Sequence, residues 1–202
     1  MREKLFTLTL FSLLFLLTTL AAAAQTNDRP PETSFEVTLS VVSGSNDAAS
    51  RGDLPASLGP VAKQLRSTFG LSNLRVADTY VGRIGNNGNI SYKSLANIDN
   101  DQRSDTPSFL DWTIGGLRNA SGQNGLFIQA FRFGARVPIR VASGGTDQGG
   151  KALSTLQYEQ IGLNVERVTL AQNTPVLIGT IAMPKADGGR VFLVLNVSPA
   201  AN

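Results

Sequence analysis

The sequence contains no histidine and no cysteine. Without an imidazole or a thiol, the chain cannot build a Ser-His-Asp or Cys-His catalytic site, and it cannot bind zinc or iron through histidine or thiolate ligands. It also cannot form a disulfide, so a hydrophobic core must stabilise the fold. These absences leave carboxylate-pair chemistry, a Ser-Lys dyad or no chemistry, and among these we expect a non-enzymatic protein without a metal site or a cofactor.

Two catalytic arrangements need neither residue type. A Ser-Lys dyad of the S-x-x-K kind is excluded, because no lysine after residue 24 has a serine three positions before it. A pair of carboxylates, as in glycoside hydrolases, stays open as a minor alternative. The acidic residues that could form such a pair are Glu36, Asp78, Asp111, Glu159 and Glu166.

Charged and aromatic residues are both scarce. The chain carries 18 Lys and Arg against 15 Asp and Glu, and part of this small surplus lies in residues 2–4. A balance this even argues against nucleic acid as a partner. Only 7% of the residues are aromatic. Among them Trp112, Tyr80 and Tyr92 could stack on a sugar, so a carbohydrate-binding module is an alternative reading, although aromatic side chains in strands more often belong to the core.

Long hydrophobic runs are missing except at the N-terminus. The basic start Met1–Lys4, the apolar run Leu5–Leu20 and the small residues that end at Ala24 have the three regions of a secretory signal peptide. We therefore expect a signal peptide at residues 1–24, a flexible leader at 25–33 and a single β-rich domain at 34–202. The exported protein would be periplasmic or extracellular in a bacterium, with no transmembrane span after cleavage.

One segment predicts a helix, near residues 57–69. Its apolar residues recur at helical spacing, Ser57 is the expected N-cap, Pro60 suits the first turn and Gly70 suits the left-handed C-terminal position. Everything else that is periodic alternates with a period of two, which is typical of strands. The predicted fold is mainly β (α+β), an antiparallel sheet or β-sandwich with this one amphipathic helix.

The predicted strands follow one another along the chain with turn-rich segments between them. Residues 74–84 and 89–95 flank the turn Gly85–Gly88 and are expected to pair as a hairpin. Gly134 and Pro138 suggest a bulge or an edge position within the long strand 126–141. Apolar positions change from odd to even numbers near Arg167, as a one-residue bulge would cause. The full set of expected strands is 34–41, 74–84, 89–95, 110–114, 126–141, 153–160, 161–170, 176–179 and 190–197.

Three arginines are spaced four residues apart in the strand 126–141. Arg132, Arg136 and Arg140 fall on one strand face at intervals of about 13 Å. Such a row matches a series of anionic groups, for example lipid phosphates, acidic glycans or the carboxylates of a partner protein. The plainer alternative is a solvated face on which acidic side chains of neighbouring strands pair with the arginines.

The segment 161–197 has the most β-prone sequence of the domain, and it ends in the nearly all-apolar run Val191–Val197. A strand that is apolar on both faces is expected at the centre of a covered sheet. The order of an alternating strand, Thr174–Gly179, a turn and this last run resembles the closing segment of the outer-membrane secretin family. The whole chain is also similar to small exported proteins of unknown function.

The resemblance implies an accessory module of the periplasm or envelope that lacks enzymatic activity. Together with the composition, it favours a binding or assembly protein that could serve a secretion or pilus system. The expected partners are an envelope assembly or an anionic surface, contacted by Arg132, Arg136 and Arg140. The competing hypothesis is the carbohydrate-binding module or, less favoured, the carboxylate-pair glycan hydrolase.

Overall fold

The computed structural model describes residues 33–46, 52, 54–96, 98, 106–120, 125–146, 152–184 and 189–200. The expected signal peptide at 1–24 and the leader at 25–32 lie outside the described residues. All the elements below belong to one compact unit, Thr33–Asn202.

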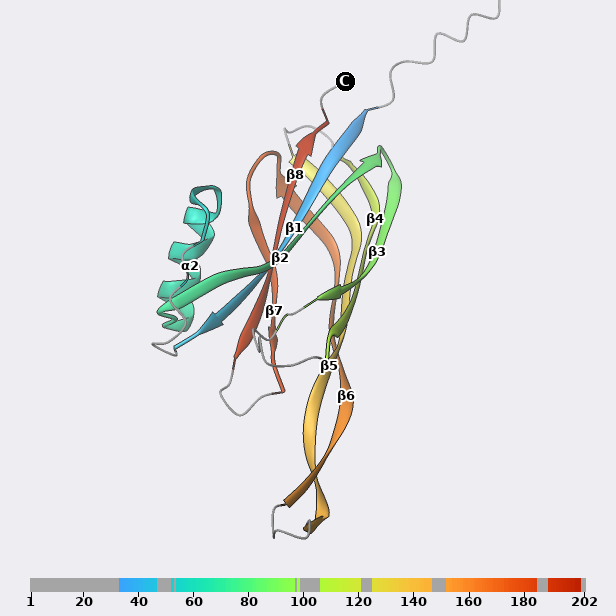
Figure 1. The fold of residues 1–202 in the computed structure, drawn as a ribbon. Coiled ribbons are helices and arrows are strands. Elements are labelled where there is room, and N and C mark those ends of the chain that lie inside the picture. The colour runs from blue at the N-terminus through green and yellow to red at the C-terminus, as the bar shows by residue number, and fades with distance from the viewer. Residues whose placement is uncertain are drawn as a thin grey trace, which may run out of the picture. The chain divides into compact units, whose positions relative to one another are not determined.

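Eight strands and one α-helix make up the described part of this unit (Figure 1). Sheet A has the strand order β2-β1-β8-β7 and sheet B has the order β3-β4-β5-β6, and every pairing is antiparallel. The prediction of a mainly β fold with one helix is confirmed. The elements are β1 Ser34–Ser45, the 3-10 turn η1 Ala56–Leu58, α2 Gly59–Phe69, β2 Asn73–Gly85, β3 Gly88–Ala96, β4 Ser108–Asn119, β5 Gly125–Thr146, β6 Ala152–Ala171, β7 Val176–Ala182 and β8 Arg190–Pro199.

The main core lies between the two sheets. Leu39 on β1 and Leu195 on β8 face Trp112 on β4 and Phe131 on β5, and all four side chains are fully buried. A second core lies on the other side of sheet A, where Val61, Ala62 and Leu65 of α2 pack against side chains that include Phe192. The layers are therefore helix, sheet A and sheet B. Strand β8 is buried on both faces, as its sequence predicts, whereas its neighbour β7 forms the edge of sheet A.

The helix begins later than expected. Ser57 does not cap it, because Ala56–Leu58 form a 3-10 turn and Leu58 occupies the N-cap position without a side-chain hydrogen bond. Pro60 lies in the first turn of α2, where the missing N–H is not needed. Gly70 ends the helix with φ of +64°, and its N–H donates to the Arg66 carbonyl at 3.0 Å. The left-handed C-cap is thus correct and the N-cap is not.

The expected hairpin of residues 74–84 and 89–95 is wrong in its pairing. The turn is present between β2 and β3, with Asn87 at φ of +58°. However, β2 pairs with β1 in sheet A and β3 pairs with β4 in sheet B, so the chain crosses from one sheet to the other at this turn. Gly82 leaves space that Ile90 of β3 occupies, which lets the two sheet edges approach closely.

Strands β5 and β6 form the longest hairpin, and it protrudes beyond the other strands (Figure 1). Pairing of β4 with β5 ends at Phe109 opposite Arg136, whereas β5 and β6 stay paired as far as Thr146 and Ala152. Pro138 lies in this two-stranded part, where β5 has one partner instead of two and a missing N–H is easier to accommodate. The two segments 153–160 and 161–170 are one continuous strand, β6.

Candidate functional site

The outer face of sheet B carries the three predicted arginines. Arg132, Arg136 and Arg140 are all exposed, and they alternate along β5 with the buried residues Phe133 and Val137. No part of the chain that the structure describes covers this face in the way α2 covers sheet A. The sequence therefore placed these residues on the exposed face correctly.

The alternative interpretation of this row expected acidic side chains opposite the arginines on the neighbouring strands, and the structure places other residues there. Arg132 lies between Thr113 and Asn164, and Arg136 lies between Phe109 and Gln160. Arg140 has only Leu156 opposite it. The nearby Asp111 is paired with Gly134 and its carboxylate lies against that glycine, where a Cβ would meet Oδ1 at 2.9 Å. Within the described residues, none of the three guanidinium groups forms an ion pair.

An aromatic cluster anchors the middle arginine at the base of the protruding hairpin. The Arg136 guanidinium lies 4.8 Å from the centre of the Phe109 ring, and that ring lies 5.6 Å from the ring of Tyr158 on β6. The Tyr158 hydroxyl donates to the Pro107 carbonyl at 3.2 Å. Phe109 and Tyr158 are 37% and 43% exposed. A hollow of about 320 Å³ lies beside this cluster, between β3, β4, β5 and β6.

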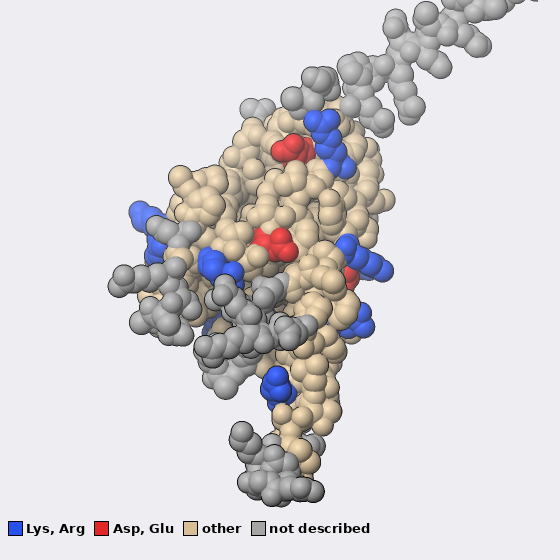
Figure 2. All heavy atoms as spheres, viewed as in Figure 1, with Lys and Arg blue, Asp and Glu red and all other residues tan. Residues whose placement is uncertain are grey.

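The hairpin beyond this cluster is amphipathic and exposed. Leu156, Leu153 and Val141 show 43%, 48% and 38% of their surface to solvent. In the view of Figure 2 a basic side chain lies on the protruding hairpin, whereas the acidic side chains lie over the body of the domain. Exposed apolar and cationic groups side by side are typical of a protein-binding surface.

The aromatic residues of the carbohydrate hypothesis belong to the core. Trp112 is fully buried and Tyr80 is 7% exposed. The Tyr92 ring stacks on Trp112, with ring centres 5.3 Å apart and an angle of 2° between the planes. Because the stacking face of Trp112 is occupied by Tyr92, these rings do not form a platform for a sugar. Burial of Trp112 and Tyr80 at the interface of the two sheets therefore disfavours this part of the alternative hypothesis.

Tyr80 also bridges the two sheets through hydrogen bonds. Its hydroxyl donates to Asp78 Oδ2 at 2.8 Å and accepts from the Ser94 hydroxyl on β3 at 2.9 Å. Burial, together with the neighbouring Asp78 and against the opposing effect of the Ser94 bond, raises the pKa of Tyr80 from 10.0 to about 12. The Asp78 carboxylate accepts a second bond from the Thr79 N–H at 2.8 Å. Asp78 is thus occupied in holding the fold together.

The other candidate carboxylates are spread over several strands. Glu36 lies on β1 in sheet A, Asp111 on β4, and Glu159 and Glu166 on β6. The described residues contain no group of three or more acidic side chains that could hold a metal ion. In the described part of the chain no helix has the length and apolar character that crossing a membrane requires.

A feature that the sequence did not predict runs across sheet B, and we call it the crease. Buried positions on β4 change from even numbers, ending at Ile114, to odd numbers, starting at Leu117. Those on β5 change between Ile128 and Phe131, and the inward-facing positions on β6 change at Arg167. The inward-facing positions switch at the same level on all three strands, so the pairing register between the strands does not shift there. The one-residue bulge that was expected in β6 alone is therefore a switch shared by β4, β5 and β6.

Two residues of the crease have left-handed backbones. Gly116 on β4 has φ of +64°, and Arg167 on β6 has φ of +58°. Glycine adopts this conformation freely, whereas for an L-residue with a side chain it costs about 1–2 kcal/mol. The sequence therefore places an arginine where a glycine would relieve the strain. The sequence contains two signals of the crease, namely the change of apolar parity near Arg167 and a similar change from Ile114 to Leu117, and the prediction used only the first.

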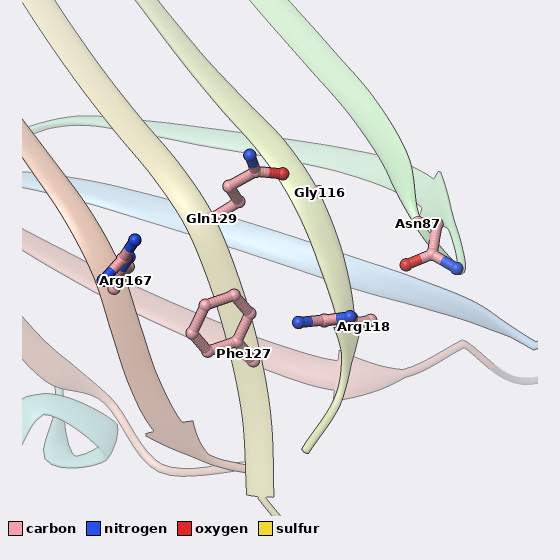
Figure 3. Close-up of a pocket in the computed structure, with 6 residues that line it drawn as sticks. All are labelled: Asn87, Gly116, Arg118, Phe127, Gln129 and Arg167. Atoms are coloured by element: carbon pink, nitrogen blue, oxygen red, sulfur yellow. The ribbon is translucent and has the colours of Figure 1, made fainter. Parts of the chain in front are cut away.

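A pocket of about 350 Å³ opens at the crease (Figure 3). The Arg118 guanidinium lies 4.9 Å from the centre of the Phe127 ring. The Gly116 N–H donates to the side-chain carbonyl of Asn89 at 3.1 Å. None of the lining side chains is acidic. The residues that line the pocket are Asn87, Gly116, Arg118, Phe127, Gln129 and Arg167.

Comparisons with solved structures find distant neighbours, among them a pilus secretin and a secretion injectisome. No protein-family model matches the sequence, and no curated protein matches it. The type IV competence pilus secretin PilQ of V. cholerae is 9% identical, with a TM-score of 0.40, and the match covers 92% of this chain and 66% of that one. The Salmonella SPI-1 type III secretion injectisome basal body, with proteins InvG, PrgH and PrgK, gives 10% identity, a TM-score of 0.32 and coverages of 95% and 50%.

The chain thus spans about two thirds of the first neighbour and half of the second. Both neighbours are parts of secretion or pilus machinery, and the first is a secretin. With TM-scores below 0.5, neither likeness establishes a shared fold.

Proposed function

We propose that this chain is a non-enzymatic binding or assembly module of the bacterial cell envelope, accessory to a secretion or pilus system. In this proposal the exported domain contacts a partner protein through the outer face of sheet B and the β5–β6 hairpin. The observation that carries it is the row of exposed arginines Arg132, Arg136 and Arg140, whose guanidinium groups have no carboxylate opposite them on either neighbouring strand.

The chemistry of this row favours an acidic partner surface. An arginine without an internal ion pair keeps its donors free for a carboxylate of another molecule, and a bidentate pair of this kind is both strong and directional. The repeat of four residues along β5 would match acidic side chains spaced in the same way on an extended partner segment.

The cluster around Arg136 supports a contact with a protein rather than with solvent alone. Binding energy at protein interfaces is concentrated in a few large side chains, with Arg and Tyr prominent among them. Stacking on Phe109 holds the Arg136 guanidinium in place before binding, which lowers the entropy lost on association. Tyr158 is held similarly by its bond to the Pro107 carbonyl.

The test compares two variants that lose the same charge. Arg136→Gln/Arg140→Gln removes two cations from the outer face of sheet B, and Lys63→Gln/Arg66→Gln removes two from α2. After cross-linking in the native envelope, we expect quantitative mass spectrometry to recover secretion or pilus components with the wild type and the α2 variant. The sheet B variant should recover at least about tenfold less.

Equal recovery by both variants would contradict this surface as the contact. Recovery of no envelope protein by the wild type, combined with binding to glycans on an array, would support the carbohydrate-directed alternative instead. That alternative would then need a surface other than the buried Trp112.

A further inference from the structure

The crease pocket differs from the arginine row in being a hollow that is lined by residues of several strands. Arg118 on β4 and Arg167 on β6 line the same pocket from two strands that are separated by β5 (Figure 3). No acidic residue lines it. Two cations that share a hollow without an internal counter-charge favour the binding of an anionic group.

The backbone of Arg167 is strained for a residue that carries a side chain. In the same crease the sequence places a glycine at the left-handed position 116, where a Cβ would also lie only 2.8 Å from Gln129 Oε1. At Arg167 it keeps a long cationic side chain in spite of the strain. Strained residues of this kind cluster at ligand sites, where the surrounding structure holds them in place.

Arg118 is held in place without losing its donors. Its guanidinium lies over the Phe127 ring at 4.9 Å, so one flat face is covered by the ring. The N–H groups of a guanidinium point outward in the plane of the group, so stacking leaves them able to donate to an oxyanion. The pocket therefore has a cation on each side, and one of them, Arg118, is held in place before a ligand binds.

The remaining polar groups narrow the class of ligand. Asn87 and Gln129 contribute side-chain amides, which both donate and accept hydrogen bonds and so match hydroxyl groups, which do the same. The volume of about 350 Å³ lies at the small end of the range for ligand pockets, which suits a single ring rather than a long chain.

We propose that the crease pocket binds a small acidic sugar, that is, a carboxylate or phosphate group carried on one polyhydroxyl ring. Arg118 and Arg167 hold the oxyanion, and Asn87 and Gln129 contact the hydroxyls. This site is separate from the arginine row of the proposed function and does not depend on it.

The experiment titrates the purified protein by calorimetry with four probes, namely glucuronate, glucose 6-phosphate, glucose and inorganic phosphate. We expect at least one of the two acidic sugars to bind saturably. Glucose and inorganic phosphate should each bind at least about fivefold more weakly than that sugar, because each offers only half of the required groups.

The decisive variant is Arg167→Gly. Glycine tolerates φ of +58°, so the fold and the melting temperature should be kept or improved while the cation is lost. We expect the affinity for the acidic sugar to fall about tenfold or more, as for a lost charge-assisted hydrogen bond. Arg132→Gln is the matched control on the same sheet face, and it should change the affinity less than about twofold.

Three results would overturn the proposal. No saturable binding of either acidic sugar would remove the site altogether. Binding to Arg167→Gly as tight as to the wild type would place the ligand elsewhere. Inorganic phosphate that binds as tightly as the acidic sugars would show that the pocket recognises an anion alone. None of these results bears on the partner contact tested with Arg136→Gln/Arg140→Gln.

Discussion

Sheet A and sheet B are built from the same number of antiparallel strands, but their outer faces differ. Helix α2 covers the outer face of sheet A, so β8 buries five consecutive residues, Val191–Leu195. The outer face of sheet B is exposed, so β5 alternates buried apolar residues with arginines. The comparison teaches that both sheets contribute to the main core, but only sheet A is also covered on its outer face by α2, which leaves the outer face of sheet B exposed.

The largest expected effect comes from comparing a buried phenylalanine under the helix layer of sheet A with an exposed phenylalanine on the outer face of sheet B. Phe192 on β8 is fully buried and packs against the Phe69 ring of α2, with ring centres 5.1 Å apart. Phe192→Ala removes this packing and leaves a cavity, so the free energy of unfolding should fall by about 3–5 kcal/mol. The matched change on sheet B is Phe109→Ala, at a side chain that is 37% exposed, and it should cost about 1 kcal/mol.

Urea unfolding followed by circular dichroism measures both values. Equal losses for Phe192→Ala and Phe109→Ala would show that the outer face of sheet B is covered in solution, for instance by a second copy of the chain. In that case the contrast between a covered outer face on sheet A and an exposed outer face on sheet B would not hold.

A smaller effect is expected from filling glycine positions on the two outer faces. A Cβ at Gly44 of β1 would lie 2.7 Å from Leu71 Cδ1 and 2.8 Å from Phe192 Cε2, under the helix layer. A Cβ at Gly134 of β5 would meet only the Asp111 carboxylate, which can turn into solvent. We expect Gly44→Ala to lower the free energy of unfolding by about 1–3 kcal/mol. Gly134→Ala should change it by less than about 0.5 kcal/mol.

Thermal unfolding of the two alanine variants is sufficient for this test, because each change adds a single methyl group. A loss at Gly134 as large as that at Gly44 would mean that the Asp111 carboxylate is fixed in place. The outer face of sheet B would then be less adaptable than its exposure suggests.

The sequence predicted those features of the two sheets that depend on local residue patterns. The alternation of apolar and polar residues predicted the strands, and the helical spacing of apolar residues predicted α2. The continuous apolar run Val191–Val197 predicted that β8 is buried on both faces. The four-residue spacing of Arg132, Arg136 and Arg140 was enough to place them on one exposed face, because a strand has a period of two.

The rest depends on contacts between distant segments. The turn Gly85–Gly88 has the same composition whether its strands pair or separate into two sheets, so the pairing of β2 with β1 was not visible. The crease requires a left-handed backbone at Arg167, which arginine disfavours, so the conformational propensities of the residues could not predict it. Trp112 and Tyr92 have the same residue types in a core as on a sugar-binding face, and only burial distinguishes the two.

The smallest expected effect concerns Tyr80, where the two sheets meet. Its pKa is raised to about 12 by burial, so the folded protein retains the hydroxyl proton between pH 10 and 12 while the unfolded chain releases it. The contribution of Tyr80 to stability is therefore constant below pH 10 and declines as the pH rises toward 12. Because the site is partly screened by solvent, we expect a loss of about 1–2 kcal/mol over this interval.

The measurement compares wild type with Tyr80→Phe in urea unfolding at pH 9 and pH 11.5, since other groups that titrate in this range contribute equally to both proteins. At pH 9 the wild type should be more stable by about 1 kcal/mol, because it keeps the bonds to Asp78 and Ser94. At pH 11.5 this advantage should shrink or reverse. Tyr158→Phe, on the exposed hairpin, is the control. An advantage of the wild type over Tyr80→Phe that is the same at both pH values would contradict a buried, proton-retaining link between sheet A and sheet B.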